Sequence, residues 1–153
     1  MNFAKENKIT EIYYCSDNFD EDVSSFISKA NKLDIKVYWL AGDYKWFNDF
    51  SLLYEKINNY INYQNEYPNQ RLSGIHFDIE PYQDSSFDEN RIELITKLVE
   101  LASSLKSNYP GILFDYDLPF WLEDEVTFNN VTLPAYKNMI NISSRVFLMI
   151  INI

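Results

Sequence analysis

Three titratable side chains recur at every second position of one short segment, Gly74-Ile-His-Phe-Asp-Ile-Glu-Pro81. Because the side chains of a strand point alternately to its two faces, we expect His76, Asp78 and Glu80 on one face and their apolar neighbours on the other. Carboxylates on a covered sheet face are costly unless partners or water compensate them. Their presence there favours a functional role.

Two carboxyl groups at this spacing suit acid catalysis. Repulsion between like charges raises the pKa of one of them, which then holds a proton beside a charged neighbour. We expect Glu80, at the strand end, to be the acid, and Asp78 to be the assisting carboxylate. A structural alternative stays open, in which Asp78 and Glu80 cap the following loop and His76 is a hydrogen-bonded interior histidine.

Other residues could complete a site around these carboxylates. Asp115 and Asp117 share a face of the next predicted strand and could join Asp78 and Glu80 in an acidic cluster. Such a cluster could also bind Mg²⁺ or Ca²⁺, but the sequence has no recognised metal loop, so neither a metal nor another cofactor is predicted. Aromatic residues at or just after strand ends could stack on sugar faces. These are Trp39, Tyr44, Trp46, Tyr82, Phe120 and Trp121.

The elements that must hold these residues alternate between strands and helices. Apolar runs predict strands over 9–16, 35–41, 72–80, 112–117 and 145–153. Apolar stripes at helical spacing predict helices after Asp20, after Ser51 and after the capping-box pair Ser86 and Glu89. The segment 118–144 is expected to be a long loop with a short helix after Pro134.

This alternation implies right-handed crossovers and a parallel sheet, hence an α/β fold of about five βα units over residues 1–153, as one domain. An open doubly wound sheet and a barrel both satisfy it. With three glycines in the chain, no glycine-rich phosphate loop can be written, which removes the main argument for a nucleotide fold. The 153 residues fall short of the roughly 250 of a complete (β/α)8 barrel.

Composition and charge exclude several classes of partner. A hydrophobic content of 46% argues against intrinsic disorder, and a formal net charge of −10 repels nucleic acid and anionic membrane surfaces. The one cysteine, Cys15, is expected to be a buried structural thiol. The sequence begins without the apolar core of a signal peptide, so we expect a cytoplasmic protein.

The segment Ser73-Gly-Ile-His-Phe-Asp-Ile-Glu80 is similar to the DGxDxDxE signature on the fourth barrel strand of family 18 glycoside hydrolases, the chitinases and endo-β-N-acetylglucosaminidases. The resemblance implies that Glu80 protonates the glycosidic oxygen and that Asp78 orients the acetamido group of the substrate, which acts as nucleophile. Ser73 and His76 replace two earlier aspartates of the signature, which weakens the implication of an N-acetylhexosaminide substrate.

The resemblance also implies a place for each strand. The five predicted strands correspond to the second to sixth strands of a barrel. Met149-Ile-Ile-Asn152 keeps the Met and Asn of the family's sixth-strand pattern, Met-x-Tyr-Asp/Asn, and lacks its Tyr.

Three functional hypotheses follow, with carbohydrate as the expected ligand in the first two. The first is a glycoside hydrolase with Glu80 as proton donor, the second a noncatalytic sugar-binding or degenerate barrel piece, and the third a metal-dependent hydrolase. The expected edge strands, 9–16 and 145–153, are apolar and unprotected, so we also expect self-association through uncovered sheet edges.

Overall fold

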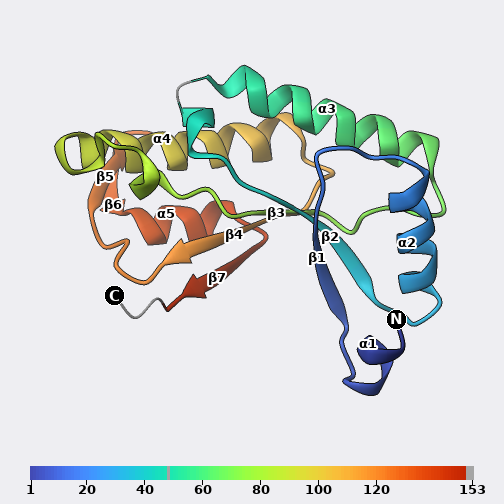
Figure 1. The fold of residues 1–153 in the computed structure, drawn as a ribbon. Helices are drawn as coiled ribbons and strands as arrows, with labels where there is room; N and C mark the ends of the chain where they lie inside the picture. The colour runs from blue at the N-terminus through green and yellow to red at the C-terminus, as the bar shows by residue number, and fades with distance from the viewer. Residues whose placement is uncertain (48, 151–153) are drawn as a thin grey trace.

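The computed structural model describes residues 1–47 and 49–150. Five strands form one parallel sheet, in the order β1 (Glu11–Cys15), β2 (Lys36–Ala41), β3 (Ile75–Phe77), β4 (Phe114–Pro119) and β7 (Arg145–Met149). The main helices between them are α2 (Glu21–Asn31), α3 (Phe50–Glu66), α4 (Phe87–Asn108) and α5 (Ala135–Ile142), as Figure 1 shows. The predicted α/β class and its run of βα units are confirmed.

Short elements complete the chain. Helix α1 (Asn2–Glu6) precedes β1, and the 3-10 helices η1 (Tyr44–Phe47) and η2 (Pro81–Gln83) follow β2 and β3. The helix predicted after Pro134 is confirmed as α5. The rest of 118–144 was predicted wrongly as a loop, because it contains a hairpin of β5 (Glu125–Phe128) and β6 (Val131–Pro134). Its turn residues, Asn129 and Asn130, have φ of 50° and 64°, which asparagine tolerates.

The observed boundaries differ from the predicted ones at two strands. The strand predicted over 72–80 is hydrogen-bonded as a strand only over Ile75–Phe77, so Asp78 and Glu80 lie beyond its end. The last predicted strand becomes β7, and residues 151–153 of that prediction, including Asn152, lie outside the described residues.

Of the three predicted helix caps, the one at α2 is confirmed and those at α3 and α4 are wrong. Asp20 caps α2 by accepting bonds from the backbone N–H groups of Asp22 (3.0 Å) and Val23 (3.2 Å), as predicted. The cap of α3 is Asp49, which accepts from the N–H of Ser51, so Ser51 is not the cap. The capping box at α4 does not form, because the Ser86 hydroxyl donates to Asp84 instead.

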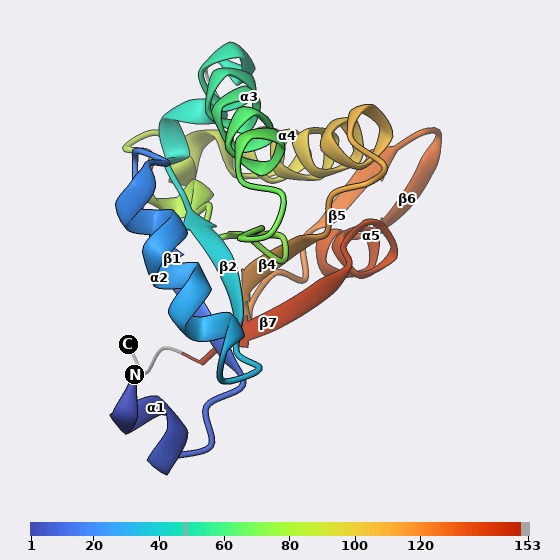
Figure 2. The same ribbon diagram turned by 90° about the vertical axis from the view of Figure 1, so that its right-hand side faces the viewer.

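One face of the sheet is covered by helices. Figures 1 and 2 show α3 and α4 lying over this face, with α2 beside β1 and β2. The hydrophobic core lies between the two layers and includes Leu53, Ile57, Ile75, Phe77, Leu98 and Leu101, all with at most 1% of their surface exposed. None of the helices in the described part of the chain combines the length and apolar character needed to span a bilayer.

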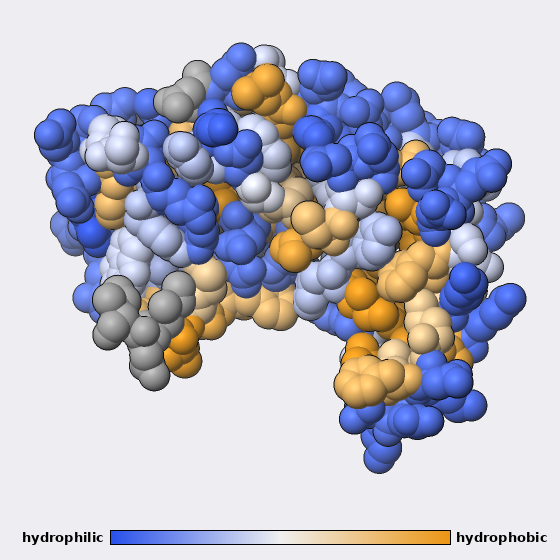
Figure 3. Space-filling model, viewed as in Figure 1, coloured by the Kyte–Doolittle hydropathy of each residue, from blue (hydrophilic) through white to orange (hydrophobic). Residues whose placement is uncertain are grey.

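The other face of the sheet is concave, and its two edge strands meet across it. Arg145 of β7 donates from Nη1 to both carboxylate oxygens of Glu11 on β1, at 2.9 Å each. The rings of Tyr13 and Phe147, also on β1 and β7, lie 5.7 Å apart. Figure 3 shows the molecule hollowed on its lower side, between the end of β7 and the start of β1. Cys15 ends β1 and is exposed, so its predicted burial is wrong.

Candidate active site

The predicted carboxylates gather at the carboxyl end of β3 and the neighbouring strand β4. Asp78 and Glu80 follow β3, and the register that pairs Phe77 with Tyr116 brings Asp78 level with Asp117 on β4. Carboxyl ends of parallel strands are where sites form in barrels and open α/β sheets. Three acidic groups therefore share one end of the sheet.

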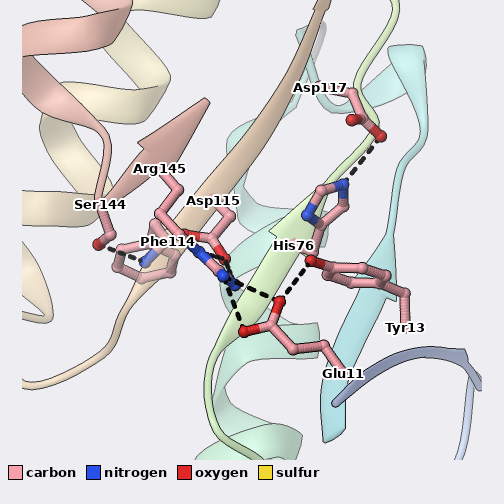
Figure 4. A network of polar contacts seen from close by, with 8 residues as sticks. All are labelled: Glu11, Tyr13, His76, Phe114, Asp115, Asp117, Ser144 and Arg145. Carbon is pink, nitrogen blue, oxygen red and sulfur yellow. Dashed lines mark hydrogen bonds and ion pairs between the residues drawn. The ribbon is translucent and has the colours of Figure 1, made fainter. Parts of the chain in front are cut away.

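His76 holds Asp117 rather than facing solvent. Its Nε2 lies 2.8 Å from Oδ2 of Asp117, as Figure 4 shows. The imidazole packs between the rings of Tyr13 (4.5 Å) and Phe147 (4.9 Å) and is 4% exposed. This burial agrees with the alternative of an interior, hydrogen-bonded histidine, which orients Asp117. A contact between His76 and substrate stays a prediction.

Asp78 is the least compensated member of the cluster. Its Oδ1 is buried and has no hydrogen-bond partner among the described residues. Burial raises the pKa of the Asp78 carboxyl above its usual range, and the nearby Asp117 raises this pKa further, while His76 opposes the rise. Its backbone is fixed by a hydrogen bond from its N–H to the carbonyl of Ala41, at 3.0 Å.

A glycine makes room for this backbone. A Cβ built on Gly42 would lie 1.8 Å from the carbonyl oxygen of Asp78, a separation that no side chain can adopt. Gly42 therefore allows the end of β2 to approach the segment that carries Asp78, and it fixes the position of that carboxylate relative to β2.

Glu80 lies half-buried where the chain turns into η2. The hydroxyl of Tyr82 and the side-chain amide of Gln83 both donate to its carboxylate. Burial raises the pKa of Glu80, and the charges of Asp78 and Asp117 add to the rise, while Gln83 works against it. A carboxyl whose pKa is raised keeps its proton to higher pH, which a general acid requires.

Asp115 does not belong to this cluster. It is 1% exposed and accepts from Nε (3.0 Å) and Nη2 (2.6 Å) of Arg145, which also binds Glu11 (Figure 4). Burial alone would raise the pKa of Glu11, but hydrogen bonds from Arg145 and Tyr13 hold it below its usual value. The Asp115 carboxylate therefore neutralises a cation at the amino end of the strands and does not join Asp78 and Glu80 in the predicted acidic cluster, and its contact with substrate stays a prediction.

An aromatic pocket of about 540 Å³ adjoins Glu80 through Tyr82. Its wall is formed by Tyr82, Phe87, Asp88, Arg91, Pro119, Phe120, Trp121 and Met149. The rings of Tyr82 and Trp121 lie 5.6 Å apart, and the guanidinium of Arg91 lies 4.7 Å from the Trp121 ring. Asp124 neutralises Arg91. The pocket thus offers flat apolar surfaces suited to an uncharged ring.

Two of the predicted stacking residues lie elsewhere. Trp39 is 3% exposed, stacks with Tyr60 of α3 at 6.1 Å and donates its indole N–H to the carbonyl of Ser16. Trp46 is 7% exposed and packs edge-on against Phe77 at 6.2 Å. Both fill the layer between sheet and helices, so Trp39 is corrected from a substrate contact to a core residue.

No protein-family model matches the sequence, and no match is found among curated proteins. Solved structures do match. A chitinase from Rhizomucor miehei superposes with a TM-score of 0.60 at 16% identity over 94% of this chain. The C-terminal domain of a putative chitinase from Desulfitobacterium hafniense superposes with a TM-score of 0.58 at 14% identity over 88% of this chain. A chitinase from Bacteroides thetaiotaomicron superposes with a TM-score of 0.54 at 19% identity over 84% of this chain.

The chain has the fold of part of a chitinase barrel. It spans about half of the Rhizomucor chain, 51%, and 38–39% of the other two. The predicted partial (β/α)8 barrel is therefore confirmed at the level of the fold. At these identities the likeness concerns the backbone arrangement, and the roles of individual side chains rest on the geometry above.

Three supporting residues were absent from the predicted site. Gln83 lies in the turn that begins at Pro81, and its spacing of three residues from Glu80 only weakly indicates a hydrogen bond between the two side chains. Gly42 directly follows the strand predicted over 35–41, and its close approach to Asp78 depends on the fold. Arg145 begins an apolar strand, where an isolated cation does signal a buried acidic partner.

Proposed function

We propose that this chain carries the acid-bearing part of a glycoside hydrolase, with Glu80 as the proton donor. The observation that supports this most is the meeting of two half-buried carboxyls with raised pKa values, Asp78 and Glu80, at the carboxyl end of the central strand. A glycosidic oxygen needs a proton as its bond breaks, and Glu80 has one to give at higher pH than an ordinary glutamic acid.

Asp78 is proposed as the assisting carboxylate. It lies two residues before Glu80 and has an unpartnered buried oxygen, which can accept a hydrogen bond from a substrate group such as an acetamido N–H. The ring of a bound sugar would rest in the neighbouring pocket on Trp121 and Tyr82. The fold shared with chitinases supports a carbohydrate as the substrate class.

A second candidate is sugar binding without catalysis. It is favoured by the pocket itself, whose aromatic surfaces bind a ring independently of Glu80. The metal-dependent hydrolase has less support. Asp115 is committed to Arg145, and the described residues contain no group of three potential ligands placed to hold a metal ion.

The test is the substitution Glu80→Gln, which removes the proton and keeps the shape. Turnover of chromogenic glycosides and of N-acetylglucosamine oligosaccharides should fall by about two orders of magnitude or more. Binding of the oligosaccharides, followed by calorimetry, should persist. Glu123→Gln, an exposed position after β4, is the matched control and should change neither.

Each outcome decides between the candidates. Unchanged turnover in Glu80→Gln refutes the role of Glu80. A wild-type chain that binds the oligosaccharides without turnover, and loses binding in Trp121→Ala, is the noncatalytic protein. Asp78→Asn should slow cleavage of N-acetylated substrates more than that of substrates without the acetamido group, if Asp78 orients that group.

A further inference from the structure

The 3-10 helix η2 folds two of its side chains back onto Glu80. Glu80 is the residue before η2, and the backbone N–H of Gln83 donates to its carbonyl at 3.1 Å. Because residues three apart in a 3-10 helix lie one above the other, Gln83 stands over Glu80. Pro81, the first residue of η2, is buried and has a fixed φ. The segment from Glu80 to Gln83 therefore places two hydrogen-bond donors beside the carboxyl group.

The two oxygens of the Glu80 carboxyl have different partners. The hydroxyl of Tyr82 donates to Oε1, and the side-chain amide of Gln83 donates to Oε2. An amide NH2 group can only donate, whereas a phenol hydroxyl can donate or accept. Oε2 is therefore an acceptor whether or not Glu80 is protonated. When Glu80 binds a proton, the oxygen that can carry it is Oε1, because the Tyr82 hydroxyl can turn and accept a bond from it.

Tyr82 also belongs to the aromatic pocket. Its ring lines the pocket and lies 5.6 Å from the ring of Trp121. The wall of the pocket, as far as the described residues form it, does not include Gln83. Oε1 is therefore the oxygen of Glu80 that a pocket residue contacts. One side chain, Tyr82, thus touches the acid with its hydroxyl and the proposed sugar site with its ring.

We propose that Glu80 carries its acid proton on Oε1 and that Tyr82 is a positioning residue that links the aromatic pocket to this proton. The proposal rests on the glycoside hydrolase function proposed above. The Oε1–H bond breaks as the proton moves to the glycosidic oxygen. The bond from that oxygen to the anomeric carbon breaks with it, its electron pair stays on the oxygen, and the carbon takes the nucleophile. The Tyr82 hydroxyl turns back and donates to the carboxylate that remains. A hydrogen bond to an ionised acceptor is stronger than one between neutral groups, so Tyr82 helps Glu80 to release its proton.

The direct test is the titration of Glu80 in the full chain, isotopically labelled at its glutamate carboxyls and followed by NMR. The Glu80 signal is the one that Glu80→Gln lacks. Tyr82→Phe keeps the ring and removes a donor to the ionised form, so the pKa of Glu80 should rise above that of the wild type. Gln83→Leu should raise this pKa too, because the amide of Gln83 lowers it in the wild type. Tyr136→Phe, at a 36% exposed tyrosine on α5, is the matched control and should leave the pKa of Glu80 unchanged.

Steady-state kinetics on N-acetylglucosamine oligosaccharides separate the hydroxyl of Tyr82 from its ring. Tyr82→Phe should lower kcat by about 10-fold, the effect of one hydrogen bond to a charged group, and change KM by less than about twofold. Tyr82→Ala should also raise KM, because it removes part of the pocket wall. Circular dichroism confirms that the variants fold.

The outcomes distinguish this proposal from the activity on which it rests. An unchanged pKa of Glu80 in Tyr82→Phe overturns the proposal even if the wild type cleaves the oligosaccharides. A larger fall of kcat in Gln83→Leu than in Tyr82→Phe would place the proton on Oε2 and would also overturn it. A wild type without turnover refutes the proposed activity, whereas a raised pKa in Tyr82→Phe would still support the contact of Tyr82 with Oε1.

Discussion

Arg145 offers a direct test of what holds the two edges of the sheet together. Its guanidinium binds Asp115 and Glu11 and lies 4.7 Å from the ring of Tyr38. In Arg145→Met the methionine keeps much of the apolar contact and removes the cation. Asp115, 1% exposed, is then a buried carboxylate without a partner.

The cost follows from the burial of the partners. Removing one member of a buried ion pair costs about 3–5 kcal/mol. The side chain of Arg145 is 37% exposed and that of Glu11 is 26% exposed, so water compensates part of the loss. We expect Arg145→Met to lower the free energy of unfolding by about 2–3 kcal/mol, which corresponds to a fall in Tm of about 5–10 °C.

Arg91 is a matched control, because it differs mainly in its acidic partner. Its side chain is 38% exposed, and its guanidinium also lies 4.7 Å from an aromatic ring, that of Trp121. Asp124, its partner, is 22% exposed, whereas Asp115 is 1% exposed. Arg91→Met should therefore cost about 1 kcal/mol or less.

Urea and thermal unfolding followed by circular dichroism measure both variants. Adding Asp115→Asn to Arg145→Met should restore part of the stability, because the unpaired charge is gone. Equal losses in Arg145→Met and Arg91→Met would refute the argument that the burial of Asp115 sets the cost.

Two further predictions concern the carboxylate cluster. Because burial and Asp117 raise the folded-state pKa of Asp78, its charge destabilises the fold at neutral pH, and Asp78→Asn should raise stability at pH 7 by roughly 0.5–1 kcal/mol. Thermal melts should show this gain shrinking as the pH falls through the raised pKa and vanishing below the unfolded value of about 3.9, and a gain that grows on acidification would contradict it. Gly42→Ala should cost about 2 kcal/mol or more, because its Cβ meets the backbone of Asp78. Gly111→Ala, which meets nothing within 4 Å, should be neutral in the same melts, and equal effects would refute the crowding argument.

The sequence predicts those strands and helices whose positions depend on the local alternation of apolar and polar residues. Alternation of residue types located the strand through His76, and apolar stripes located the helices. The hairpin at β5 and β6 was missed, although Val126 and Phe128 alternate with polar residues before two asparagines, which is a hairpin signal.

Contacts between distant segments could not be predicted in the same way. Both faces of β2 carry large apolar residues, so the sequence does not show that Trp39 faces the helices while Tyr38 faces Arg145. The pairing of His76 with Asp117 depends on the register of two strands 41 positions apart. Arg145 and Glu11 are 134 positions apart and meet only because the sheet is curved.

The placement of charge along the concave face connects the fold to the proposed chemistry. At the amino end of the strands Arg145 neutralises Asp115 and Glu11, and one step further His76 binds Asp117. Beyond it, neither Asp78 nor Glu80 has an ion-pair partner among the described residues. Because no cation forms an ion pair with either carboxyl at this end of the sheet in the described residues, both bear the cost of burying a charge without a partner. A proton relieves that cost, so the arrangement that destabilises an ionised Glu80 also equips it as an acid.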